Sequence, residues 1–353
     1  MSVPDAERRA MARARDLGAG VLGTTSPNPP VGAVVLAADG TPAGEGATAP
    51  PGGPHAEVVA LAQAGERARG GTAVVTLEPC AHTGRTGPCA DALLAAGIAR
   101  VVVAVPEPTE LAVGGAERLR AAGVDVELGV EQAEAEDGAL AAWLTGVRHR
   151  RPHVVWKVAG TLDGRVAAAD GSSRWVTGAE ARAAVHRLRA TCDAVLVGSG
   201  TALADDPQLT VRGPDGTDAD RQPLRVVLDR RGRLPATARV LDAAAPTLVS
   251  AAPGPRELLA QLWERDVRRV LLEGGPTLAA AFLRDGLVDE AVVHLAPKLL
   301  GSGAPLVGDL GISAIVDALT LTVVDVTRLG GDVAIRLRPN RHTGAGRTAH
   351  GRS

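Results

Sequence analysis

Four residues near the start of the chain limit its possible folds more than any other feature. They are His55, Glu57, Cys80 and Cys89. One imidazole and two thiolates are a natural zinc set, and they leave the fourth position of a tetrahedral ion open to water. A fold that uses these ligands must bring three separate segments of the chain to one point.

The order of these residues indicates which kind of zinc site they form. A His-x-Glu segment followed by Pro-Cys is the signature of zinc-dependent deaminases, in which the glutamate moves protons. Zinc lowers the pKa of a bound water to about 7, and we expect Glu57 to pass the water proton to the departing amine. The usual cysteine pair is Cys-x-x-Cys, whereas eight residues separate Cys80 from Cys89 here.

Two simpler interpretations compete with catalytic zinc. A structural zinc usually has four protein ligands, but the third cysteine, Cys192, lies in the other half of the chain and is expected to be a small buried hydrophobe. The other interpretation is that no metal binds. Each zinc-site cysteine follows a proline, Cys80 after an expected strand and Cys89 at an expected helix start, and this favours the catalytic site.

Length and charge narrow the class of protein. A chain of 353 residues is long enough for two domains. Its net charge is −2, and its basic and acidic residues are spread along the sequence, so we expect no basic face that binds nucleic acid. No apolar run approaches the length of a membrane span, and residues 1–10 are too charged for a signal peptide. We therefore expect a cytoplasmic protein that does not bind membranes.

Alternating hydrophobic patterns predict an α/β protein with layered sheets. In the first half we expect helices at 6–16, 55–69, 89–96, 116–122 and 131–142, and strands at 31–36, 73–77, 101–105 and 124–128. The second half reads as strands at 153–159, 194–197, 225–228, 267–272 and 288–295, with helices at 179–190 and from 276 to 284. We place the domains at 1–147 and 152–340 and expect a disordered tail at 341–353.

This layout brings the zinc residues together. His55 and Glu57 begin a helix, Cys80 follows a strand, and Cys89 begins the next helix. Helix N-termini beyond strand ends are common active-site positions, and their dipoles favour thiolates. The loop between the cysteines holds His82 and Arg85. A cation held beside the metal indicates a phosphorylated substrate.

Motifs along residues 5–340 resemble the bifunctional riboflavin-biosynthesis deaminase–reductases. In the first half they are Asn28-Pro29-Pro30-Val31, His55-Ala56-Glu57-Val58 and the segment 76–89 with its long cysteine spacing. In the second half they are Lys157-Val158-Ala159, Leu162-Asp163-Gly164, Ser173-Arg174-Trp175, Leu203-Ala204-Asp205-Asp206-Pro207, Glu273-Gly274-Gly275-Pro276-Thr277 and the segment 296–301.

The resemblance implies a cytidine-deaminase-like three-layer domain followed by a dihydrofolate-reductase-like domain. The first would remove ammonia from 2,5-diamino-6-(5-phosphoribosylamino)pyrimidin-4-one, and the second would use NADPH to reduce the ribosyl group to ribityl. It implies Zn²⁺ on His55, Cys80 and Cys89, with Glu57 as the proton shuttle. Deaminase substrate contacts fall on Asn28, His82 and Arg85.

In the second domain the resemblance assigns residues to the cofactor and to the substrate. NADPH-binding positions are Ala159, Trp175, Thr201, Asp205, Gly275, Pro276, Thr277, Leu278, Ala279, Ala280 and Ala281, and substrate positions are Lys157, Ser173, Arg189, Leu209, Arg212 and Glu273. A strand that ends in Gly274-Gly275 before a helix suits a cofactor phosphate, although a tight turn explains the same residues. No G-x-G-x-x-G is present, so a Rossmann domain is not supported.

Three positions depart from the family pattern. Thr48 stands where a histidine is common, Glu107-Pro108-Thr109 replaces Asp-Pro-Asn, and Arg230 replaces a small residue at the cofactor site. Two other functions remain open: a deaminase whose second domain binds without reducing, and a zinc-stabilised nucleic-acid-binding module. We expect small-molecule substrates and a homo-oligomer, either a dimer or a tetramer.

Overall fold

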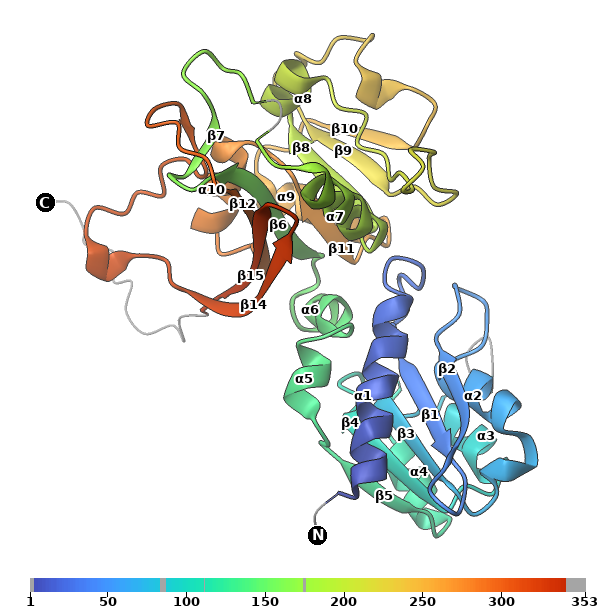
Figure 1. The fold of residues 1–353 in the computed structure, drawn as a ribbon. Helices are drawn as coiled ribbons and strands as arrows, with labels where there is room; N and C mark the ends of the chain where they lie inside the picture. The colour runs from blue at the N-terminus through green and yellow to red at the C-terminus, as the bar shows by residue number, and fades with distance from the viewer. Residues whose placement is uncertain (1–2, 83–86, 111, 174–175, 341–353) are drawn as a thin grey trace, which may run out of the picture. The chain divides into compact units, whose positions relative to one another are not determined.

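The computed structural model describes residues 3–82, 87–110, 112–173 and 176–340. It divides into two compact α/β units, and Figure 1 shows the chain from blue at the N-terminus to red at the C-terminus. The first unit runs to His153 and includes Ala190–Asp193 and Leu259–Arg269, while the second contains the remainder. The expected fold class is confirmed. The expected tail at 341–353 lies outside the described residues.

The first unit is built on one five-stranded sheet in the order β2-β1-β3-β4-β5. Strand β1 runs antiparallel to β2 and β3, whereas β3, β4 and β5 are parallel. The strands are β1 (Gly32–Leu36), β2 (Pro42–Ala47), β3 (Thr72–Leu77), β4 (Arg100–Val105) and β5 (Asp125–Leu128). Its helices are α1 (Asp5–Gly20), α2 (Ala56–Ala64), η1 (Gly65–Ala68), α3 (Cys89–Ala95), α4 (Gly115–Ala121), α5 (Gln132–Glu136) and α6 (Ala141–His149).

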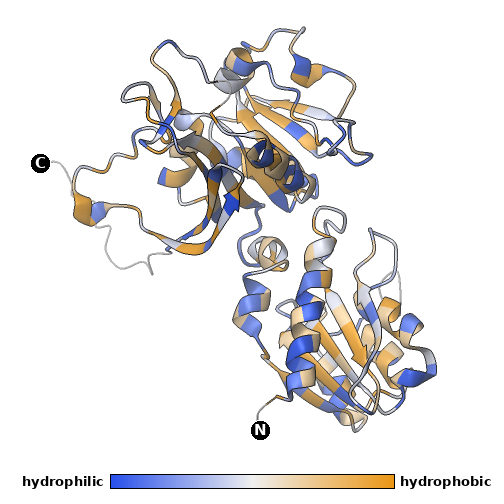
Figure 2. Ribbon diagram, viewed as in Figure 1, coloured by the Kyte–Doolittle hydropathy of each residue, from blue (hydrophilic) through white to orange (hydrophobic). Residues whose placement is uncertain are grey.

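The centre of this sheet is the core of the unit. Every residue of β1 is buried, and β3 and β4 are buried after their first residue. Strands with no polar alternation must be covered on both faces, which gives the three layers. Figure 2 shows these strands as apolar and the surrounding helices as mixed. Met11 and Ala14 of α1 belong to the buried core.

Strand β2 was not predicted, and its glycines explain why. A Cβ on Gly44 would lie 2.2 Å from the carbonyl oxygen of Ala60, and one on Gly46 would lie 2.2 Å from that of Ala56. The two glycines therefore allow helix α2 to rest directly on the backbone of β2. Glycine is depleted in strands, so the sequence pattern does not indicate one here. This close approach fixes the start of α2, which carries His55 and Glu57.

The single helix expected at 131–142 was wrong in its extent. The structure has the short helix α5, a break that contains Gly138, and then α6, which runs on to His149. Glycine weakens a helix interior, and burial of Leu140 and Leu144 anchors the second helix separately.

The second unit is built on an eight-stranded sheet in the order β10-β9-β8-β11-β6-β12-β15-β14. Parallel pairs join β10 to β9, β9 to β8, β8 to β11 and β6 to β12, whereas β15 is antiparallel to both β12 and β14. The strands are β6 (His153–Thr161), β8 (Ala194–Gly198), β9 (Leu224–Leu228), β10 (Thr247–Ser250), β11 (Arg269–Leu272), β12 (Glu290–Ala296), β14 (Leu321–Leu329) and β15 (Asp332–Pro339). A separate pair joins β7 (Arg165–Ala167) to β13 (Ala304–Pro305).

Helices connect the parallel strands of this unit. They are α7 (Ala179–Ala190), α8 (Ser199–Asp205), η2 (Arg239–Leu241), α9 (Pro255–Trp263) and α10 (Pro276–Arg284), and a further short helix, η3 (Ile315–Asp317), precedes β14. The helix expected at 179–190 is confirmed at those bounds. The C-terminal hairpin of β14 and β15 was missed, because β14 is exposed along nearly its whole length and shows no apolar alternation.

Candidate active sites

The zinc-binding residues predicted from the sequence converge in the first unit. The ligand atoms of His55, Cys80 and Cys89 all lie within 4.8 Å of one another. His55 Nδ1 is 3.1 Å from Cys89 Sγ and 3.7 Å from Cys80 Sγ. A tetrahedral zinc with ordinary N and S bond lengths separates these atoms by about 3.6 Å. The three residues therefore fit the ion, and Cys192 is not part of this group.

Local structure explains how these ligands meet. His55 is the N-cap residue of α2 and has an extended backbone. Pro88 is the N-cap residue of α3, so Cys89 is the first residue of that helix. Cys80 follows the carboxyl end of β3, and its Sγ accepts the amide N–H of Cys89 at 3.4 Å. Two helix N-termini and one strand end thus surround the site, as the sequence predicted.

Glu78 holds the segment that carries Cys80. Its Oε2 accepts the amide N–H of Glu107 at 3.0 Å, and its Oε1 accepts that of Ala116 at 2.9 Å. Gly115 packs so closely that a Cβ there would lie 1.7 Å from the carbonyl oxygen of Pro79. The buried carboxylate therefore anchors the metal loop to the start of α4.

Glu57 is a buried carboxyl group next to the ligands. Only 5% of it is exposed, and its side chain hydrogen-bonds to Cys89. Burial raises the pKa of Glu57, with smaller opposing effects from hydrogen bonding and from His55. A carboxyl group with a raised pKa beside a metal site suits proton transfer in both directions.

The two thiols are strongly coupled. The hydrogen bond from Cys89 lowers the pKa of Cys80 to about 4, and His55 also contributes. The same hydrogen bond, together with burial, raises the pKa of Cys89. The hydrogen bond to Cys80 is also the main reason that the pKa of His55 is raised. Three groups that compete for protons in this way are a suitable donor set for a cation, which replaces those protons.

Only part of the expected deaminase substrate site is described. Arg85 lies outside the described residues. His82 is half-buried, and its Nδ1 has no hydrogen-bond partner within the part of the chain that the structure describes. Asn28 is half-buried in the loop before β1, and its amide N–H donates to Thr25. No hydrogen bond joins Asn28 to the metal ligands within the described residues.

The structure describes all three positions at which the sequence departs from the family pattern. Thr48 is buried, and its Oγ1 accepts the amide N–H of Val31 at 3.0 Å, so it ties the Asn28 loop to the segment that leads to His55. Glu107 is also buried and accepts the amide of Thr109 at 3.0 Å. Burial raises the pKa of Glu107, with a further contribution from Glu78. Arg230 lies in the second unit.

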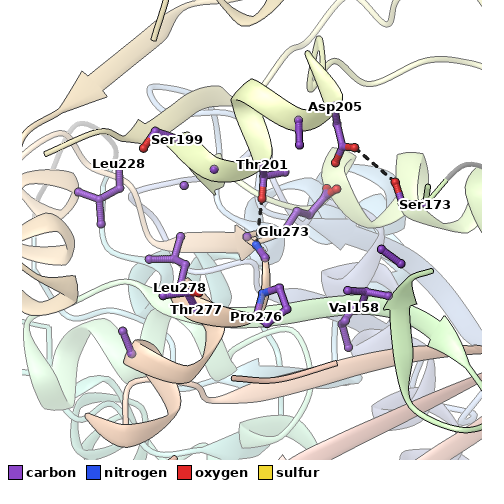
Figure 3. Close-up of a pocket in the computed structure, with 18 of the residues that line it drawn as sticks. Val158, Ser173, Ser199, Thr201, Asp205, Leu228, Glu273, Pro276, Thr277 and Leu278 are labelled. Carbon is purple, nitrogen blue, oxygen red and sulfur yellow. Dashed lines mark hydrogen bonds between the residues drawn. The ribbon is translucent and has the colours of Figure 1, made fainter. Parts of the chain in front are cut away.

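The second unit contains a cavity of about 980 Å³. Figure 3 shows it between helix α8 above and the start of α10 below, with Glu273 reaching in from the end of β11. Thr201 Oγ1 accepts the amide N–H of Gly275 at 3.0 Å, and Ser173 Oγ donates to Asp205 at 3.4 Å. Of the residues expected to bind cofactor or substrate, those that line the cavity are Lys157, Ala159, Ser173, Thr201, Asp205, Glu273, Gly275, Pro276, Thr277, Leu278 and Ala281.

The remaining expected residues lie elsewhere. Trp175 is outside the described residues. Ala279 and Ala280 are buried on the inner side of α10 and do not line the cavity. Leu209 is buried with a φ of 58°, and Arg212 forms an ion pair with Asp218 at 3.5 Å.

Arg189 reaches the site through Glu273. Its Nε and Nη2 donate to the two carboxylate oxygens of Glu273 at 2.7 and 2.9 Å, and its Nη1 donates to the carbonyl of Thr210 at 2.9 Å. Burial alone would raise the pKa of Glu273, but the charge and hydrogen bonds of Arg189 outweigh it and lower that pKa. Burial and the charge of Arg189 lower the pKa of the neighbouring Lys157, against the attraction of Glu273.

Sequence reasoning missed one group of cavity residues. Arg231 and Arg233 line the cavity beside Arg230, in the loop after β9. A run of basic residues directly after a buried parallel strand is the signal that could have identified them, because ligands bind at such strand ends.

Fold and sites together define a two-domain enzyme, with a zinc deaminase domain before a pyrimidine-reductase-like domain. The model of the "cytidine and deoxycytidylate deaminase zinc-binding region" matches residues 5–105, and that of the "RibD C-terminal domain" matches residues 152–335. The chain belongs to the RibD family of bifunctional riboflavin biosynthesis proteins. Membership in this family does not favour the two other functions considered from the sequence, a second domain that binds its ligand without reducing it and a zinc-stabilised nucleic-acid-binding module.

Related proteins and solved structures match this chain along most of its length. The riboflavin biosynthesis protein RibD of Mycobacterium tuberculosis is 49% identical over 317 residues, which cover 90% of this chain and 93% of the relative. That of Escherichia coli is 40% identical over 363 residues, with 93% and 98% covered. The structure of Acinetobacter baumannii RibD matches with a TM-score of 0.85 at 40% identity, and covers 95% of this chain and 99% of its own.

A fourth match carries a name that describes two activities. The structure of a "diaminohydroxyphosphoribosylaminopyrimidine deaminase/5-amino-6-(5-phosphoribosylamino)uracil reductase" from Thermotoga maritima matches with a TM-score of 0.87 at 35% identity, and covers 95% of this chain and 99% of its own. No helix in the described part of this chain has the length and apolar character needed to cross a membrane.

Proposed function

We propose that the first domain, residues 1–147, deaminates 2,5-diamino-6-(5-phosphoribosylamino)pyrimidin-4-one, and that the second, residues 152–340, reduces the product with NADPH. The observation that carries this proposal is the convergence of His55, Cys80 and Cys89 within 4.8 Å, beside the buried carboxyl group of Glu57. The two activities in the name of the Thermotoga maritima relative support the choice of substrates.

In the first site the chain's residues bind zinc and move protons. His55 Nδ1 and the two thiolates would hold zinc, which when bound supplies an activated water as the nucleophile. Glu57 would accept the proton of that water and deliver it to the amino group as ammonia departs. His82 and Arg85 would bind the substrate phosphate, and Asn28 the pyrimidine ring.

In the second site the cavity would hold NADPH and the phosphoribosyl group side by side. Bound NADPH supplies the hydride. The positive end of the α10 helix dipole would favour the cofactor phosphates. Ala159, Thr201, Asp205, Pro276, Thr277, Leu278 and Ala281, which line the cavity, would surround the rest of the cofactor, and Trp175 would also contact it. Ser173, Leu209 and Arg212 would contact the substrate.

Lys157 and Glu273 would contact the ribosyl group where it is reduced. Burial lowers the pKa of Lys157, which makes its ammonium group a better proton donor. Arg189 keeps Glu273 ionised through the paired hydrogen bonds between them.

We also propose that the chain forms a homodimer through β14. This strand is at the edge of its sheet and is exposed on both faces. Val323 and Val326 are 58% and 59% exposed, and Ile315 of η3 is 92% exposed. An exposed, partly apolar edge strand is a template for pairing with another strand, and Asp325 and Arg328 give it complementary charges for a second copy. Replacing Val323 and Val326 by lysine should give monomers in sedimentation equilibrium, and an unchanged mass would contradict this interface.

The cytoplasm remains our predicted compartment, because both thiol ligands must stay reduced.

Replacement of Glu57 by Gln tests the deaminase proposal directly. The zinc ligands remain intact, so the variant should bind one zinc per chain but release ammonia at least a hundredfold more slowly, the range expected for a lost general acid–base group. Normal ammonia release with zinc bound would overturn the role of Glu57.

A further inference from the structure

A glutamine in the second unit links a carboxylate to an arginine that is expected to bind the substrate. Gln208 precedes Leu209 in the segment that leads to Arg212. Its Nε2 donates to Asp242 Oδ2 at 2.8 Å, and its Oε1 accepts a hydrogen bond from Arg212 Nη2. We propose that Gln208 is a positioning residue of the reductase, which holds the guanidinium group of Arg212 in the orientation that binds the substrate. This inference rests on the proposed contact between Arg212 and the substrate.

The chemistry of the amide group explains why a glutamine suits this position. A carboxylate only accepts hydrogen bonds and a guanidinium group only donates them, whereas a primary amide does both. The amide of Gln208 therefore fits between Asp242 and Arg212 in one orientation, with its oxygen toward the arginine. Arg239 Nη2 also donates to this oxygen, at 3.4 Å. Because the amide carries no charge, it orients the guanidinium group and leaves the positive charge of Arg212 for an anion.

A buried arginine holds both the side chain and the backbone of Gln208. The side chain of Arg225 is fully buried, and its Nη1 donates to Asp242 Oδ1 at 2.7 Å. The same nitrogen donates to the carbonyl oxygen of Gln208 at 3.3 Å, and Nη2 donates to that of Asp242 at 2.5 Å. The hydrogen bond from Arg225 is the main reason that the pKa of Asp242 is lowered. Asp242 therefore stays ionised at neutral pH and remains an acceptor for the amide.

Contacts of the same segment place Arg212 close to the expected site of reduction. The amide N–H of Arg212 donates to His186 Nδ1 at 3.1 Å, and the carbonyl of Thr210 accepts Arg189 Nη1 at 2.9 Å. Burial and the charges of Arg189 and Arg212 lower the pKa of His186, against the attraction of Glu273. His186 thus lies near all three charges. Arg189 and Glu273 pair with each other, so Arg212 is the cation of this group that is suited to a substrate phosphate.

One carboxylate competes with the substrate for Arg212. Asp218 Oδ1 is 3.5 Å from Arg212 Nε, and the two side chains are 44% and 37% exposed. An exposed ion pair of this kind contributes little to stability. A guanidinium group has five N–H donors, and Gln208 uses one of the two on Nη2. In the described structure the second hydrogen of Nη2 and both hydrogens of Nη1 remain, and two adjacent nitrogens can bind a phosphate together.

Steady-state kinetics of the zinc-loaded full chain test the proposal through a double-mutant cycle. The reduction of 5-amino-6-(5-phosphoribosylamino)uracil should be measured on the wild type, Gln208→Met, Arg212→Met and the double variant. Methionine keeps the length of glutamine but cannot replace its amide. Gln208 is half-buried, so this change should not unfold the domain, and Gln208→Ala provides a second variant if it does. Gln132→Met is the matched control, because it makes the same change at an exposed glutamine of α5.

We expect the KM for the substrate to rise about fivefold in Gln208→Met and about tenfold or more in Arg212→Met, from weakened or lost charge-assisted hydrogen bonds. In both variants, kcat and the Kd for NADPH should change less than about twofold, because neither side chain contacts the cofactor in this proposal. In the Arg212→Met background, the loss of Gln208 should raise KM less than about twofold, since no guanidinium group is left to orient. Gln132→Met should match the wild type.

Two results would overturn the proposal while leaving the role of Arg212 intact. One is an unchanged KM in Gln208→Met when Arg212→Met raises it. The other is a rise from Gln208→Met that is equally large with and without Arg212, because that rise would come from the folding of the segment. An unchanged KM in Arg212→Met would instead show that the proposed contact of Arg212 with the substrate is wrong, and this inference would fail with it.

Discussion

Replacing Arg189 by Met should destabilise the second unit in a manner that depends on pH. The side chains of Arg189 and Glu273 are 14% and 12% exposed and share two hydrogen bonds of 2.7 and 2.9 Å. Removing one partner of such a pair costs about 3–5 kcal/mol, because the other charge stays buried. Glu273 can escape this penalty by taking up a proton.

Protonation sets the size of the effect. The ordinary pKa of Glu273 is 4.5, so neutralising the carboxylate at pH 7 costs about 3.4 kcal/mol, or 2.5 units at 1.36 kcal/mol each. At pH 5 the same step costs only about 0.7 kcal/mol. In Arg189→Met the folded pKa of Glu273 lies above the unfolded value, so the variant's stability relative to wild type falls as pH rises above 4.5. We expect the loss to be about 2–3 kcal/mol larger at pH 7 than at pH 5.

Urea unfolding followed by circular dichroism at both pH values measures this difference. Arg189→Met combined with Glu273→Gln is the matched control, since it removes the buried charge and should abolish the pH dependence. A loss below 1 kcal/mol for the single variant, or one that is equal at pH 5 and pH 7, would refute the idea of a buried pair that water does not reach.

Three further predictions follow from the geometry. Burial, with the charge of Lys157, lowers the pKa of His294 to about 4, so the folded state disfavours protonation of this residue. The free energy of unfolding measured in urea should therefore fall by up to about 3 kcal/mol as pH drops from 6.5 to 4, and His294→Gln should reduce this dependence on pH. Gly46→Ala should lower the free energy of unfolding by about 1–3 kcal/mol and weaken zinc binding in a chelator competition, because its Cβ would displace the start of α2. Gly20→Ala is the control: no atom lies within 4 Å of the added Cβ, so neither stability nor zinc binding should change. After zinc removal, a thiol reagent followed by peptide mass spectrometry should label Cys80 before Cys89 and Cys192, because only Cys80 is partly exposed; equal labelling of all three would contradict the described burial.

The zinc site could be predicted because its information is local. His55 and Glu57 share one helix start, and each cysteine directly follows a proline at the end of a strand or the start of a helix. The alternation of strands and helices then implies that these ends meet. No more distant contact was needed to identify the ligands.

The reductase site was less accessible to sequence reasoning, because its main contacts are long-range. Arg189 and Glu273 are 84 residues apart, and neither segment indicates that the other is its partner. The structure buries Arg189 against Glu273, a contact that neither local sequence pattern predicts. Strand β2 escaped detection because Gly44 and Gly46 serve the packing of α2 rather than a strand pattern.

The most direct test of the whole account is the conversion of one substrate by both domains. The purified chain should be incubated with zinc, NADPH and 2,5-diamino-6-(5-phosphoribosylamino)pyrimidin-4-one, and the products followed by mass spectrometry. We predict loss of one amino group as ammonia, followed by a gain of two hydrogens that requires NADPH. Deamination without the later gain of hydrogens would contradict the reductase assignment, and no release of ammonia by the zinc-loaded chain would contradict the account at its first step.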